Sequence, residues 1–517
     1  MDMQVAKKKL GLKERYALMT RDLGWDTTYQ PMNKVFPQAE YEGIKIHDWS
    51  KWEDPFRLTM DAYWKYQAEK EKKLYAIIDA YAQNNGHLNV TDARYINAIK
   101  LFLNGISPLE YMAHRGFAGV GRQFPGVGTR VACLMQSLDE IRHSQTQIHA
   151  MSNYNKYYNG FHDYTTMIQR VWYLSVPRSF FDDAITAGPF EFMIAIGFSF
   201  EYVLTNLLFV PFVSGAAYNG DMGTMSFGFS AQSDEARHMT LGLESIKFIL
   251  EQDPANLPII QRWIDKWTWR GMRVLMLVGM MMDYMLPKRV MSWKEAWEIY
   301  FEQNGGALFK DLARYGIRPP KCAEQALIDK EHITHQAWAA FYNYSAAAAF
   351  HTWVPAPEEM DWLSAKYPNT FDKYYRPRLE FWREQAQQGK RFYTNTLPLL
   401  CQVCQVPMFF TEPDDPTKIC YRRSEYRGDQ FHTCSDHCKA IFDHEPEKYI
   451  QAWLPTHQVY QGHCFPEGAD PGAAGFDPLT EVLKYYELGL GRDNLDFDGS
   501  EDQRNFAAWR NTATRNG

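Results

Sequence analysis

The sequence predicts a mainly α-helical protein that carries one small cysteine-rich module. The first observation is periodicity: from about Pro55 to His351, apolar residues recur at spacings of three and four, and Gly or Pro falls at the breaks. The second is that no run in this region shows the strict polar and apolar alternation that is typical of strands. The third is that five of the eight cysteines lie within residues 401–455.

Length and composition indicate a large globular protein. The 517 residues allow two to four domains at the usual size of about 100–200 residues each. Hydrophobic residues make up 45% and charged residues 23%, which is ordinary globular usage and excludes disorder for the bulk of the chain. The 16 Trp, 31 Tyr and 32 Phe indicate a large, well-filled core. The net charge of -7 argues against nucleic-acid binding.

No segment of the sequence predicts secretion or membrane insertion. The N-terminal residues carry charges throughout and lack the apolar run of a secretory signal. The most apolar stretch, residues 190–210, is interrupted by Glu191 and Glu201, whereas a membrane span needs about 20 apolar residues. Eight cysteines in 517 residues do not form a disulfide scaffold. We therefore expect a cytoplasmic protein that contacts neither a membrane nor nucleic acid.

In chain order, the sequence predicts five parts. Residues 1–55 scatter Pro and Gly among short helical pieces and are expected to form an irregular N-terminal arm. Residues 56–352 carry the helical period and are expected to form one helical domain. Residues 353–400 are rich in Trp, Tyr and Pro and are expected to connect this domain to the cysteine-rich module at 401–455. Residues 456–517 hold an excess of acidic residues and are expected to form an extended tail.

Seven helices are expected within the helical domain, each bounded where Gly or Pro interrupts the apolar period. They are predicted at about 57–84, 91–117, 122–152, 190–217, 223–251, 256–285 and 323–350. The stretch 116–128 is rich in glycine, but it lacks the GxGxxG spacing of a phosphate-binding loop and follows no strand. We therefore expect a break between two helices there.

One five-residue pattern occurs twice in the chain. Asp-Glu-Ile-Arg-His at residues 139–143 recurs as Asp-Glu-Ala-Arg-His at residues 234–238, and these hold the only two Glu-x-x-His pairs. Residues three apart lie on one helix face, about 5–6 Å from each other, so one metal ion can accept both side chains. A single such pair is usually a surface ion pair. Two matching copies are typical of a di-iron four-helix bundle.

A di-iron bundle also needs one carboxylate from each of two further helices. Glu201 is the first, because it lies among apolar residues where an unpartnered carboxylate is costly. Glu110 is the second, although a helix-surface carboxylate is an alternative for it. Each half of the chain then has a Glu helix followed, 30 or 34 residues later, by a Glu-x-x-His helix. The expected ligands of this ferritin-like bundle are Glu110, Glu140, His143, Glu201, Glu235 and His238.

Charge balance favours two divalent metal ions in this bundle. Four carboxylates neutralise two Fe²⁺, and a neutral cluster is tolerated in a dry core where four bare carboxylates are not. Ligand sets rich in carboxylate suit iron or manganese more than zinc, and oxygen chemistry favours iron. Asp139 and Asp234 are expected to accept the second ring N–H of the two histidines, crosswise between the halves. Salt bridges to Arg142 or Arg237 are an alternative, and both roles can hold at once.

With this pattern the sequence resembles the large hydroxylase subunit of the bacterial multicomponent monooxygenases, which include the soluble methane, toluene and phenol monooxygenases. The resemblance covers about residues 55–350, and the N-terminal arm and cysteine module extend it most closely to the phenol hydroxylases. It implies that the six residues are the family's iron ligands. It also implies that Thr205 is the active-site threonine and that Asn206 and Gln232 are the gating amides. Gln147 stands where the methane enzymes carry a cysteine, which argues against methane as the substrate.

The resemblance further implies a substrate pocket beside the metals, lined by Ile106, Ala113, Phe180, Phe200 and Phe209. Most of these residues lie within two or three turns of the ligands on the same helices, so they could line an apolar cavity. Plain core packing is the alternative for each Phe. For Thr205 the resemblance implies a proton donor in O₂ activation that does not bind metal. The alternative is a bond back to the carbonyl four residues earlier, which helical Thr often makes.

The cysteine-rich module contains two closely spaced pairs. Cys401-x₂-Cys404 and Cys434-x₃-Cys438 are separated by 29 residues, which predicts a tetrahedral Cys₄ zinc site. Residues 431–442 resemble the small metal-binding modules known as TRASH or YHS domains. A Cys₄ site has no open position, so we expect a structural role for it. Replacement of one Cys by His432 or Cys420 stays open, and the other cysteines, Cys133, Cys322 and Cys464, are expected to be buried thiols.

Together the residues and the resemblance predict a di-iron hydroxylase subunit that uses O₂ to convert phenol or a methylphenol to a catechol. The chain has no flavin, nicotinamide or iron–sulfur motif, so its electrons are expected from a separate reductase. The resemblance implies an NADH-linked reductase with FAD and a 2Fe–2S cluster, a small coupling protein, and two smaller hydroxylase subunits in a dimer of heterotrimers. Alternatives are a toluene or other arene monooxygenase, a ribonucleotide reductase radical subunit, and an iron-storage or metal-handling protein.

Overall fold

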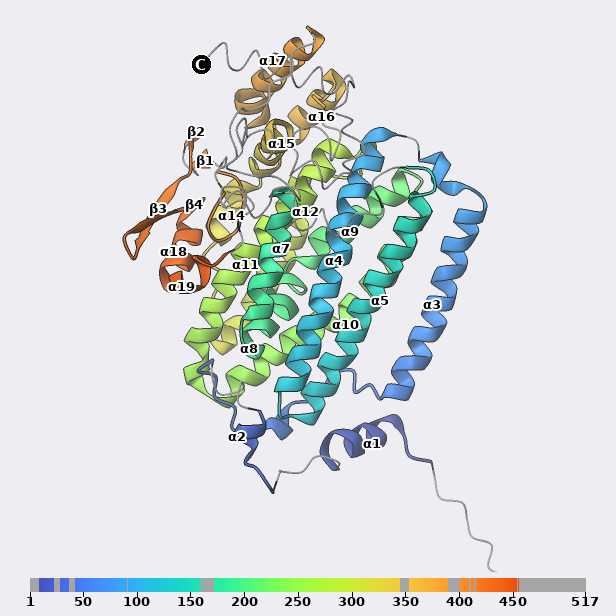
Figure 1. The fold of residues 1–517 in the computed structure, drawn as a ribbon, viewed down its shortest axis with the longest axis vertical. Coiled ribbons are helices and arrows are strands. Elements are labelled where there is room, and N and C mark those ends of the chain that lie inside the picture. Colours follow the sequence, from blue (N-terminus) through green and yellow to red (C-terminus); the bar gives the residue numbers. More distant parts are fainter. Residues whose placement is uncertain are drawn as a thin grey trace, which may run out of the picture.

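Four long helical segments form the centre of the molecule (Figure 1). They are α4 (Ala93–Gln123), α5 (Val127–Tyr154), the broken segment from α8 (Pro189–Phe192) to α9 (Thr205–Tyr218), and α10 (Met222–Gln252). The computed structural model describes residues 9–22, 28–36, 42–90, 92–158, 161, 172–344, 353–388, 400–408, 411–412, 415–452 and 454. The tail expected at 456–517, with Cys464, lies outside the described residues.

Capping side chains explain where two bundle helices begin. The carboxylate of Asp92 precedes α4 and accepts a hydrogen bond from the backbone N–H of Arg94 at 2.9 Å. Asp221 precedes α10 and accepts from the N–H of Thr224 at 3.0 Å. Such caps satisfy N–H groups that have no partner within the helix. The break between α4 and α5 falls at 124–126, within the glycine-rich stretch where the sequence predicted one.

The third bundle segment is not one continuous helix, which corrects the helix expected at 190–217. A π-helix, η5 (Met193–Phe200), follows α8, and a turn at 201–204 separates it from α9. In the wider turns of this helix the N–H of Glu201 bonds to the carbonyl of Ile196, five residues earlier, at 2.9 Å. Segments of π-helix are frequent at functional sites. This one ends at a residue that the sequence predicts to bind metal.

Two glycines allow this segment to approach α10 closely. A side-chain carbon added at Gly242 would lie 1.9 Å from the carbonyl oxygen of Gly197. Only glycine, which lacks that carbon, permits the contact without moving a helix. Gly242 lies one helical turn after His238, and Gly197 lies one turn before Glu201. The contact therefore brings the third and fourth bundle segments together at the level of the predicted ligands.

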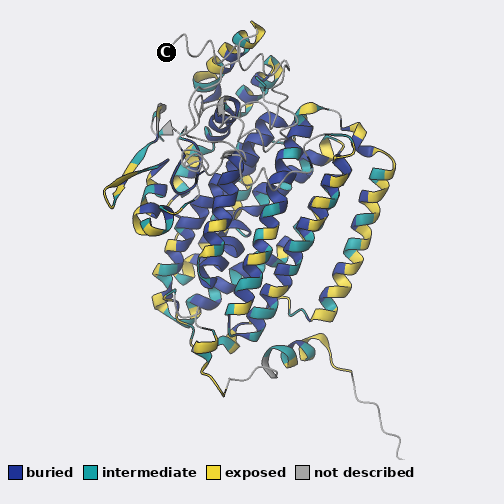
Figure 2. Cartoon of the chain, viewed as in Figure 1, coloured by how far each residue is buried: buried dark blue, intermediate teal, exposed yellow. Residues whose placement is uncertain are grey.

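Outer helices cover the bundle on two sides (Figure 1). On one side α3 (Met60–Gln83) packs against α5 and α10. On the other side α7 (Trp172–Thr186) packs against α4, and α11 (Leu257–Met280) packs against α7, η5 and α15 (Ile333–Tyr344). Figure 2 shows that α11 is buried along most of its length, whereas α3 exposes its outer face. The sequence did not predict α7, because Pro177 inside it normally interrupts a helix.

The remaining helices are short. They are α1 (Leu12–Ala17), η1 (Leu18–Asp22), α2 (Met32–Val35), η3 (Trp49–Lys51), η4 (Gly86–Asn89), η6 (Pro254–Asn256), η7 (Met281–Met285), α12 (Trp293–Trp297), η8 (Glu298–Gly305), α13 (Gly306–Leu312), η9 (Ala313–Tyr315), α14 (Ala323–Asp329), α16 (Pro357–Lys366), η10 (Phe371–Tyr375) and α17 (Arg376–Gln387). Residues 353–388, expected only as a connection, thus contain three of these helices, α16, η10 and α17. Among the described residues, no single helix is long and apolar enough to cross a membrane, and one bent pair, Pro189–Phe200 with Thr205–Tyr218, passes that test of length and composition only when taken together.

The cysteine-rich module holds the strands that the structure describes. β1 (Thr411–Glu412) pairs with β2 (Asp415–Ile419), and β3 (Arg422–Tyr426) pairs with β4 (Asp429–Thr433), both antiparallel. The turn between β3 and β4 uses Arg427 and Gly428, which have φ values of 54° and 86°. Positive φ at both central residues is the geometry of a tight hairpin. Two helices, α18 (Asp436–His444) and α19 (Pro446–Tyr449), complete the module.

Candidate metal centre

The four bundle segments bring the six predicted ligands together in the core. Glu110 comes from α4, Glu140 and His143 from α5, Glu201 from the end of η5, and Glu235 and His238 from α10, and all six are buried. Ligand atoms lie within 4.8 Å of one another in two groups, which are Glu110, Glu140 and His143, and Glu140, Glu201 and His238. Glu140 belongs to both groups. The arrangement therefore offers two adjacent metal positions that share a carboxylate.

Both histidines direct the same ring nitrogen at the carboxylates. Nδ1 of His143 lies 3.6 Å from Glu110 and 3.6 Å from Glu235, and it has no hydrogen-bond partner. Nδ1 of His238 lies 3.2 Å from Glu235 and 3.4 Å from Glu140. For His143, a buried ring nitrogen that faces carboxylates without a hydrogen-bond partner is the arrangement expected of a metal ligand, and Nδ1 of His238 faces carboxylates in the same way.

The opposite ring nitrogens are held crosswise. Nε2 of His143 lies 3.1 Å from Asp234 on α10, and Nε2 of His238 lies 3.1 Å from Asp139 on α5. A ring that donates Nε2–H to a carboxylate keeps its Nδ1 lone pair for a metal ion. Asp139 also pairs with Arg142 at 3.0 Å and with Arg237, so the salt bridges coexist with the bonds to histidine.

Helix α3 supplies a set of partners to these two aspartates that sequence reasoning missed. The hydroxyl of Tyr63 donates to Asp139 at 2.7 Å, and the amide of Gln67 donates to both Asp139 and Asp234 at 2.9 Å. Lys70 forms an ion pair with Asp234. The three residues are spaced by four and three along one helix face. That spacing alone does not distinguish them from other polar residues of an amphipathic helix.

Two glutamines donate hydrogen bonds to the carboxylates at either end of the site. Nε2 of Gln136 donates to both oxygens of Glu201 at 2.9 Å, and Nε2 of Gln147 donates to Glu110 at 3.0 Å. Sequence reasoning singled out Gln147 and missed Gln136. The signal was present, because Gln136, Glu140, His143 and Gln147 follow at steps of four, three and four on one face of α5.

The pKa values of Glu140, Glu201 and His143 are shifted from their usual ranges. Burial raises the pKa of Glu140 well above its usual range, and the charges of Glu201, Glu110 and Glu235 raise it further. Burial also raises the pKa of Glu201, to about 8. Burial lowers the pKa of His143, but its contacts with Asp234 and Glu110 raise it overall, to about 10. The raised pKa values of Glu140 and Glu201 mean that burial among carboxylates disfavours their charged forms unless cations lie beside them.

The donor set fits two iron ions. Two divalent ions would balance four carboxylates, and the two imidazoles would bind as neutral ligands through Nδ1. A set rich in carboxylate oxygen and poor in thiolate suits iron or manganese. Nothing in this cluster resembles the thiolate-rich, closed arrangement of a structural zinc site.

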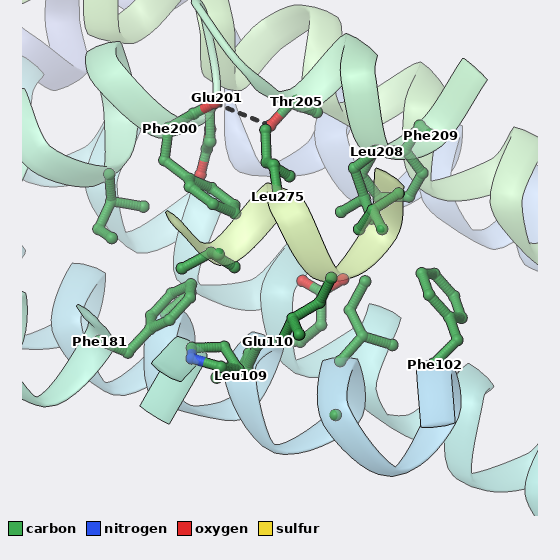
Figure 3. Close-up of a pocket in the computed structure, with 18 of the residues that line it drawn as sticks. Phe102, Leu109, Glu110, Phe181, Phe200, Glu201, Thr205, Leu208, Phe209 and Leu275 are labelled. Atoms are coloured by element: carbon green, nitrogen blue, oxygen red, sulfur yellow. Dashed lines mark hydrogen bonds between the residues drawn. The ribbon is translucent and has the colours of Figure 1, made fainter. Parts of the chain in front are cut away.

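An apolar cavity opens directly on the carboxylates. Its lining includes Glu110, Glu140, Glu201 and Glu235 together with Ile106, Ala113, Phe200 and Phe209, four of the five residues expected in the substrate pocket. In Figure 3, Phe181 and Phe200 lie toward one end of the cavity, and Phe102 and Phe209 lie toward the other. The rest of the lining is almost entirely aliphatic, with Leu, Ile, Val and Met side chains from α4, α7, η5, α9, α11 and η7.

Phe180 is the exception, and its assignment to the pocket is corrected. Its neighbour Phe181 lines the cavity, while Phe180 packs behind the wall on Phe200 and Trp267, with ring centroids 5.2 and 5.4 Å away. Successive residues of an α-helix point about 100° apart, because a turn holds 3.6 residues. On α7 that rotation directs Phe181 into the cavity and Phe180 into the core.

The three predicted polar residues lie in different settings. Thr205 is buried and lines the cavity, and its hydroxyl donates to the carbonyl of Phe200 at 3.2 Å (Figure 3). This bond spans five residues instead of four, since the π-helix ends there and shifts the hydrogen-bonding register. Asn206 and Gln232 are only half-buried, and neither lines the cavity.

The four predicted zinc ligands form a second cluster, in the cysteine module. The sulfurs of Cys401, Cys404, Cys434 and Cys438 lie within 4.8 Å of one another and are buried. Two of the sulfur–sulfur distances, Cys404–Cys434 and Cys434–Cys438, are 3.5 and 3.8 Å. Corners of a tetrahedron around zinc, with bonds of about 2.3 Å, are about 3.8 Å apart. These four thiols therefore suit one zinc ion.

The alternative zinc ligands take no part in this cluster. Cys420 is buried but lies outside the group of four, and Nδ1 of His432 is bonded to the hydroxyl of Tyr421 at 2.5 Å. Cys133 and Cys322, expected to be buried thiols, are fully buried free cysteines.

Comparison with known proteins agrees with this geometry. The chain matches the Methane/Phenol/Alkene Hydroxylase family over residues 25–253 and the YHS domain family over residues 410–453. It is 67% identical to phenol 2-monooxygenase, oxygenase component DmpN, of Pseudomonas sp. (strain CF600), over 97% of this chain and 95% of the relative. It is 28% identical to the alkene monooxygenase system, oxygenase component subunit alpha, of Xanthobacter autotrophicus, over 83% of this chain and 87% of the relative.

The fold agrees as well. The structure of xenon-pressurized phenol hydroxylase from Pseudomonas sp. OX1 matches with a TM-score of 0.89 and 66% identity, over 97% of this chain and 100% of that chain. The resemblance predicted from the sequence is thereby confirmed. This chain belongs to the methane/phenol/alkene hydroxylase family, as an oxygenase component of the multicomponent di-iron monooxygenases.

Proposed function

We propose that this chain hydroxylates phenol or a methylphenol, placing one atom of O₂ in a ring C–H bond and releasing a catechol. The observation that carries the proposal is an apolar, Phe-lined cavity that opens onto four carboxylates of the metal centre. Such a cavity accepts a small aromatic ring and brings it to the metals. The high identity to a phenol 2-monooxygenase oxygenase component supports the same substrate class. Membership of this family sets aside the radical-subunit and iron-storage alternatives.

The proposed iron ligands are the six converging side chains Glu110, Glu140, His143, Glu201, Glu235 and His238. When bound, the iron pair supplies the electrons and the Lewis acidity that activate O₂. The chain's own residues do the rest of the positioning. Asp139 and Asp234 hold the two imidazoles in the tautomer that leaves Nδ1 free. Gln136 and Gln147 orient the carboxylates of Glu201 and Glu110.

The cavity residues determine how the ring is held. Ile106, Phe181 and Phe200 form apolar walls that exclude water and position the ring against the carboxylates. Thr205 is the one hydroxyl among the cavity-lining side chains, so it can deliver a proton during O₂ activation. Asn206 and Gln232 are proposed as gating amides, because each lies within a helical turn of a cavity-lining residue and is half-exposed.

Electrons and protons must reach this chain from outside it. A multicomponent monooxygenase implies further subunits and a reductase. We propose that the reductase is NADH-linked and carries FAD and a 2Fe–2S cluster. We also propose a small coupling protein and two smaller hydroxylase subunits in a dimer of heterotrimers. The Cys₄ cluster is proposed to hold one structural zinc ion, supported by its tetrahedral spacing and the YHS match.

The direct test is isotopic labelling. The oxygenase assembled with its partner subunits, coupling protein, reductase and NADH is given phenol under ¹⁸O₂, and the product is identified by mass spectrometry. We expect catechol with one ¹⁸O atom, and a smaller yield from toluene than from phenol. Catechol without label, or no catechol while toluene is oxidised, would contradict the proposed substrate and reaction.

A further inference from the structure

One buried carboxylate outside the metal centre joins three parts of the chain. Asp183, near the end of α7, is 7% exposed. It accepts hydrogen bonds from Arg270 of α11 at 2.5 Å and from the hydroxyl of Tyr449 of α19 at 2.7 Å. Lys448 pairs with its carboxylate and donates to its backbone carbonyl at 3.1 Å. Asp183 thus ties the two helices to the cysteine module.

The charges around Asp183 balance. Lys266 of α11 lies 3.7 Å from Asp183 and 2.8 Å from both Glu191 and Glu445. With Arg270 and Lys448, three cations face three carboxylates. Burial raises the pKa of Asp183, but Lys266, Arg270 and Lys448 hold it well below its usual range. A buried network with every charge compensated fixes the relative positions of the segments that supply it.

The cysteine cluster contacts the same helix a second time. Nε1 of Trp269 donates to the sulfur of Cys438 at 3.1 Å, and the guanidinium of Arg273 stacks on the ring of Trp269 at 3.8 Å. The buried cations Arg270 and Arg273 also interact electrostatically with Cys404 and Cys438. Four thiolates around one divalent ion would leave negative charge in excess, and these two cations, although paired with Asp183 and Asp329, lie near enough to attract it.

The same two helices form part of the wall of the substrate cavity, α7 with the face opposite Asp183 and α11 with residues that begin one turn after Arg270. Phe181 lines the cavity two residues before Asp183, and Val274 lines it one turn after Arg270. α11 also packs tightly against the bundle, since a side-chain carbon added at Gly271 would lie 2.5 Å from the side chain of Leu204. A shift of either helix on the module side therefore changes the shape of the cavity. The cavity residues from the two helices are Leu174, Pro177, Phe181, Val274, Leu275, Leu277 and Val278.

We propose that Asp183 and the cysteine module position α7 and α11, and thereby determine which ring-substituted phenols the cavity accepts. Asp183, Trp269 and Arg270 are positioning residues in this account, because none of them lines the cavity. The cysteine module would then contribute to substrate specificity in addition to its structural role. The inference rests on the proposed function for the identity of the substrate class.

The test compares two adjacent aspartates of α7. Asp183→Asn removes the buried charge at constant size, and Asp182→Asn is the matched control, because Asp182 is exposed. KM and kcat are measured for phenol and for 2-, 3- and 4-methylphenol, with iron and zinc per chain. For Asp183→Asn we expect unchanged iron, kcat for phenol within about threefold, and KM for at least one methylphenol shifted about tenfold or more relative to phenol. Asp182→Asn should match the parent.

A second variant and a binding measurement test the proposal independently of the folding of Asp183→Asn and of turnover. Trp269→Phe removes the N–H bond to Cys438 and should shift the same methylphenol ratios even if Asp183→Asn fails to fold. Affinities of the four phenols measured by calorimetry depend on the shape of the cavity whether or not the protein oxidises phenol. Failure of this inference can therefore be distinguished from failure of the proposed function. Parental affinity ratios, KM ratios and products in every folded variant of Asp183 and Trp269 would overturn the inference.

Discussion

At the residue scale, the carboxylate of Glu201 needs cations beside it. It follows the apolar π-helical segment η5 and is 4% exposed. The amide of Gln136 bonds to both of its oxygens, but one neutral donor does not cancel a buried charge. Burial raises its pKa to about 8. A metal ion held together with Glu140 and His238 would provide the missing positive charge.

The hydroxyl of Thr205 provides a prediction about coupling. Thr205→Val keeps the shape of the side chain and removes the donor that bonds to the Phe200 carbonyl. We expect parental iron content and phenol affinity, turnover slowed about 10–1000-fold at most, and more O₂ consumed per catechol. An oxygen electrode with catechol quantification measures this ratio. If rate and coupling equal those of the parent, Thr205 is only a helix-packing residue.

The neighbouring phenylalanines of α7 provide a second prediction. Phe181→Leu enlarges the cavity, so we expect dimethylphenols to become better substrates, with kcat/KM raised about tenfold relative to phenol. Phe180→Leu is the matched control, because Phe180 is fully buried behind the wall. It should lower the melting temperature with little change in substrate preference. Equal substrate preference in both variants would show that the cavity wall is assigned wrongly.

The six metal-facing residues could be predicted from the sequence because their pattern repeats. Two copies of Glu-x-x-His, each preceded by a carboxylate helix, are the arrangement of a di-iron bundle and rarely arise by coincidence. The residues that support them could not be found in this way. Gln136 and Gln67 are neutral amides without a repeat, and only the packing of α3 and α5 brings them to the site. The choice between Phe180 and Phe181 depends on the rotation of α7, which two adjacent aromatics do not reveal.

At the element scale, the contact between η5 and α10 controls the width of the site. Gly242→Ala would place a carbon 1.9 Å from the carbonyl of Gly197. We expect a loss of about 1–3 kcal/mol of unfolding free energy, as for other overpacked cores, together with weaker iron binding. Gly119→Ala on α4 is the control, because nothing lies within 4 Å of its added carbon. It should be neutral or stabilising by up to about 1 kcal/mol.

Chemical denaturation and metal analysis of the two glycine variants decide this point. Parental stability with two irons in Gly242→Ala would mean that η5 can move away from α10 without cost, and that the close contact does not set the site.

The cysteine module provides a prediction about zinc. Cys401→Ser or Cys434→Ser should release one zinc ion and unfold residues around 400–455, because small modules of this kind depend on metal for folding. Iron in the bundle should remain if the protein stays soluble. Cys420→Ser is the matched control, since Cys420 is buried in the same module outside the cluster. Full zinc retention in both ligand variants would show that other residues bind it.

The elements divide into those that periodicity can reveal and those that it cannot. α3, α4, α5, α10 and α11 have long amphipathic or apolar periods. Their limits lie within about three residues of those expected, except that α4 extends to Gln123, α5 begins at Val127 and α11 ends at Met280. The break at 201–204 was missed, because a π-helix has the same composition as an α-helix. The structure shows it in the turn at 201–204 and in the five-residue hydrogen bond from Glu201 to Ile196.

At the scale of the whole molecule, the bundle lies between two sets of outer helices (Figure 1). α3 lies on one side and holds the aspartates behind both histidines. α7 and α11 lie on the other side and form part of the cavity wall, and the cysteine module packs against α11. A mainly helical fold with a four-helix centre could be predicted, since the ligand order requires it. The side of the bundle that each outer helix covers could not be predicted, because the apolar face of a helix predicts that it is buried but not which element it packs against.

Six side chains from four helical segments are proposed to hold two irons in one centre. Metal analysis and ⁵⁷Fe Mössbauer spectroscopy of the parent and of Glu201→Ala test it most directly, with Glu244→Gln as control, because Glu244 pairs with Lys247 at the surface of α10. We predict two irons per chain in one exchange-coupled pair for the parent and the control, and loss of one or both irons with loss of turnover in Glu201→Ala. Two irons and parental turnover in Glu201→Ala, or magnetically independent irons in the parent, would contradict the claim.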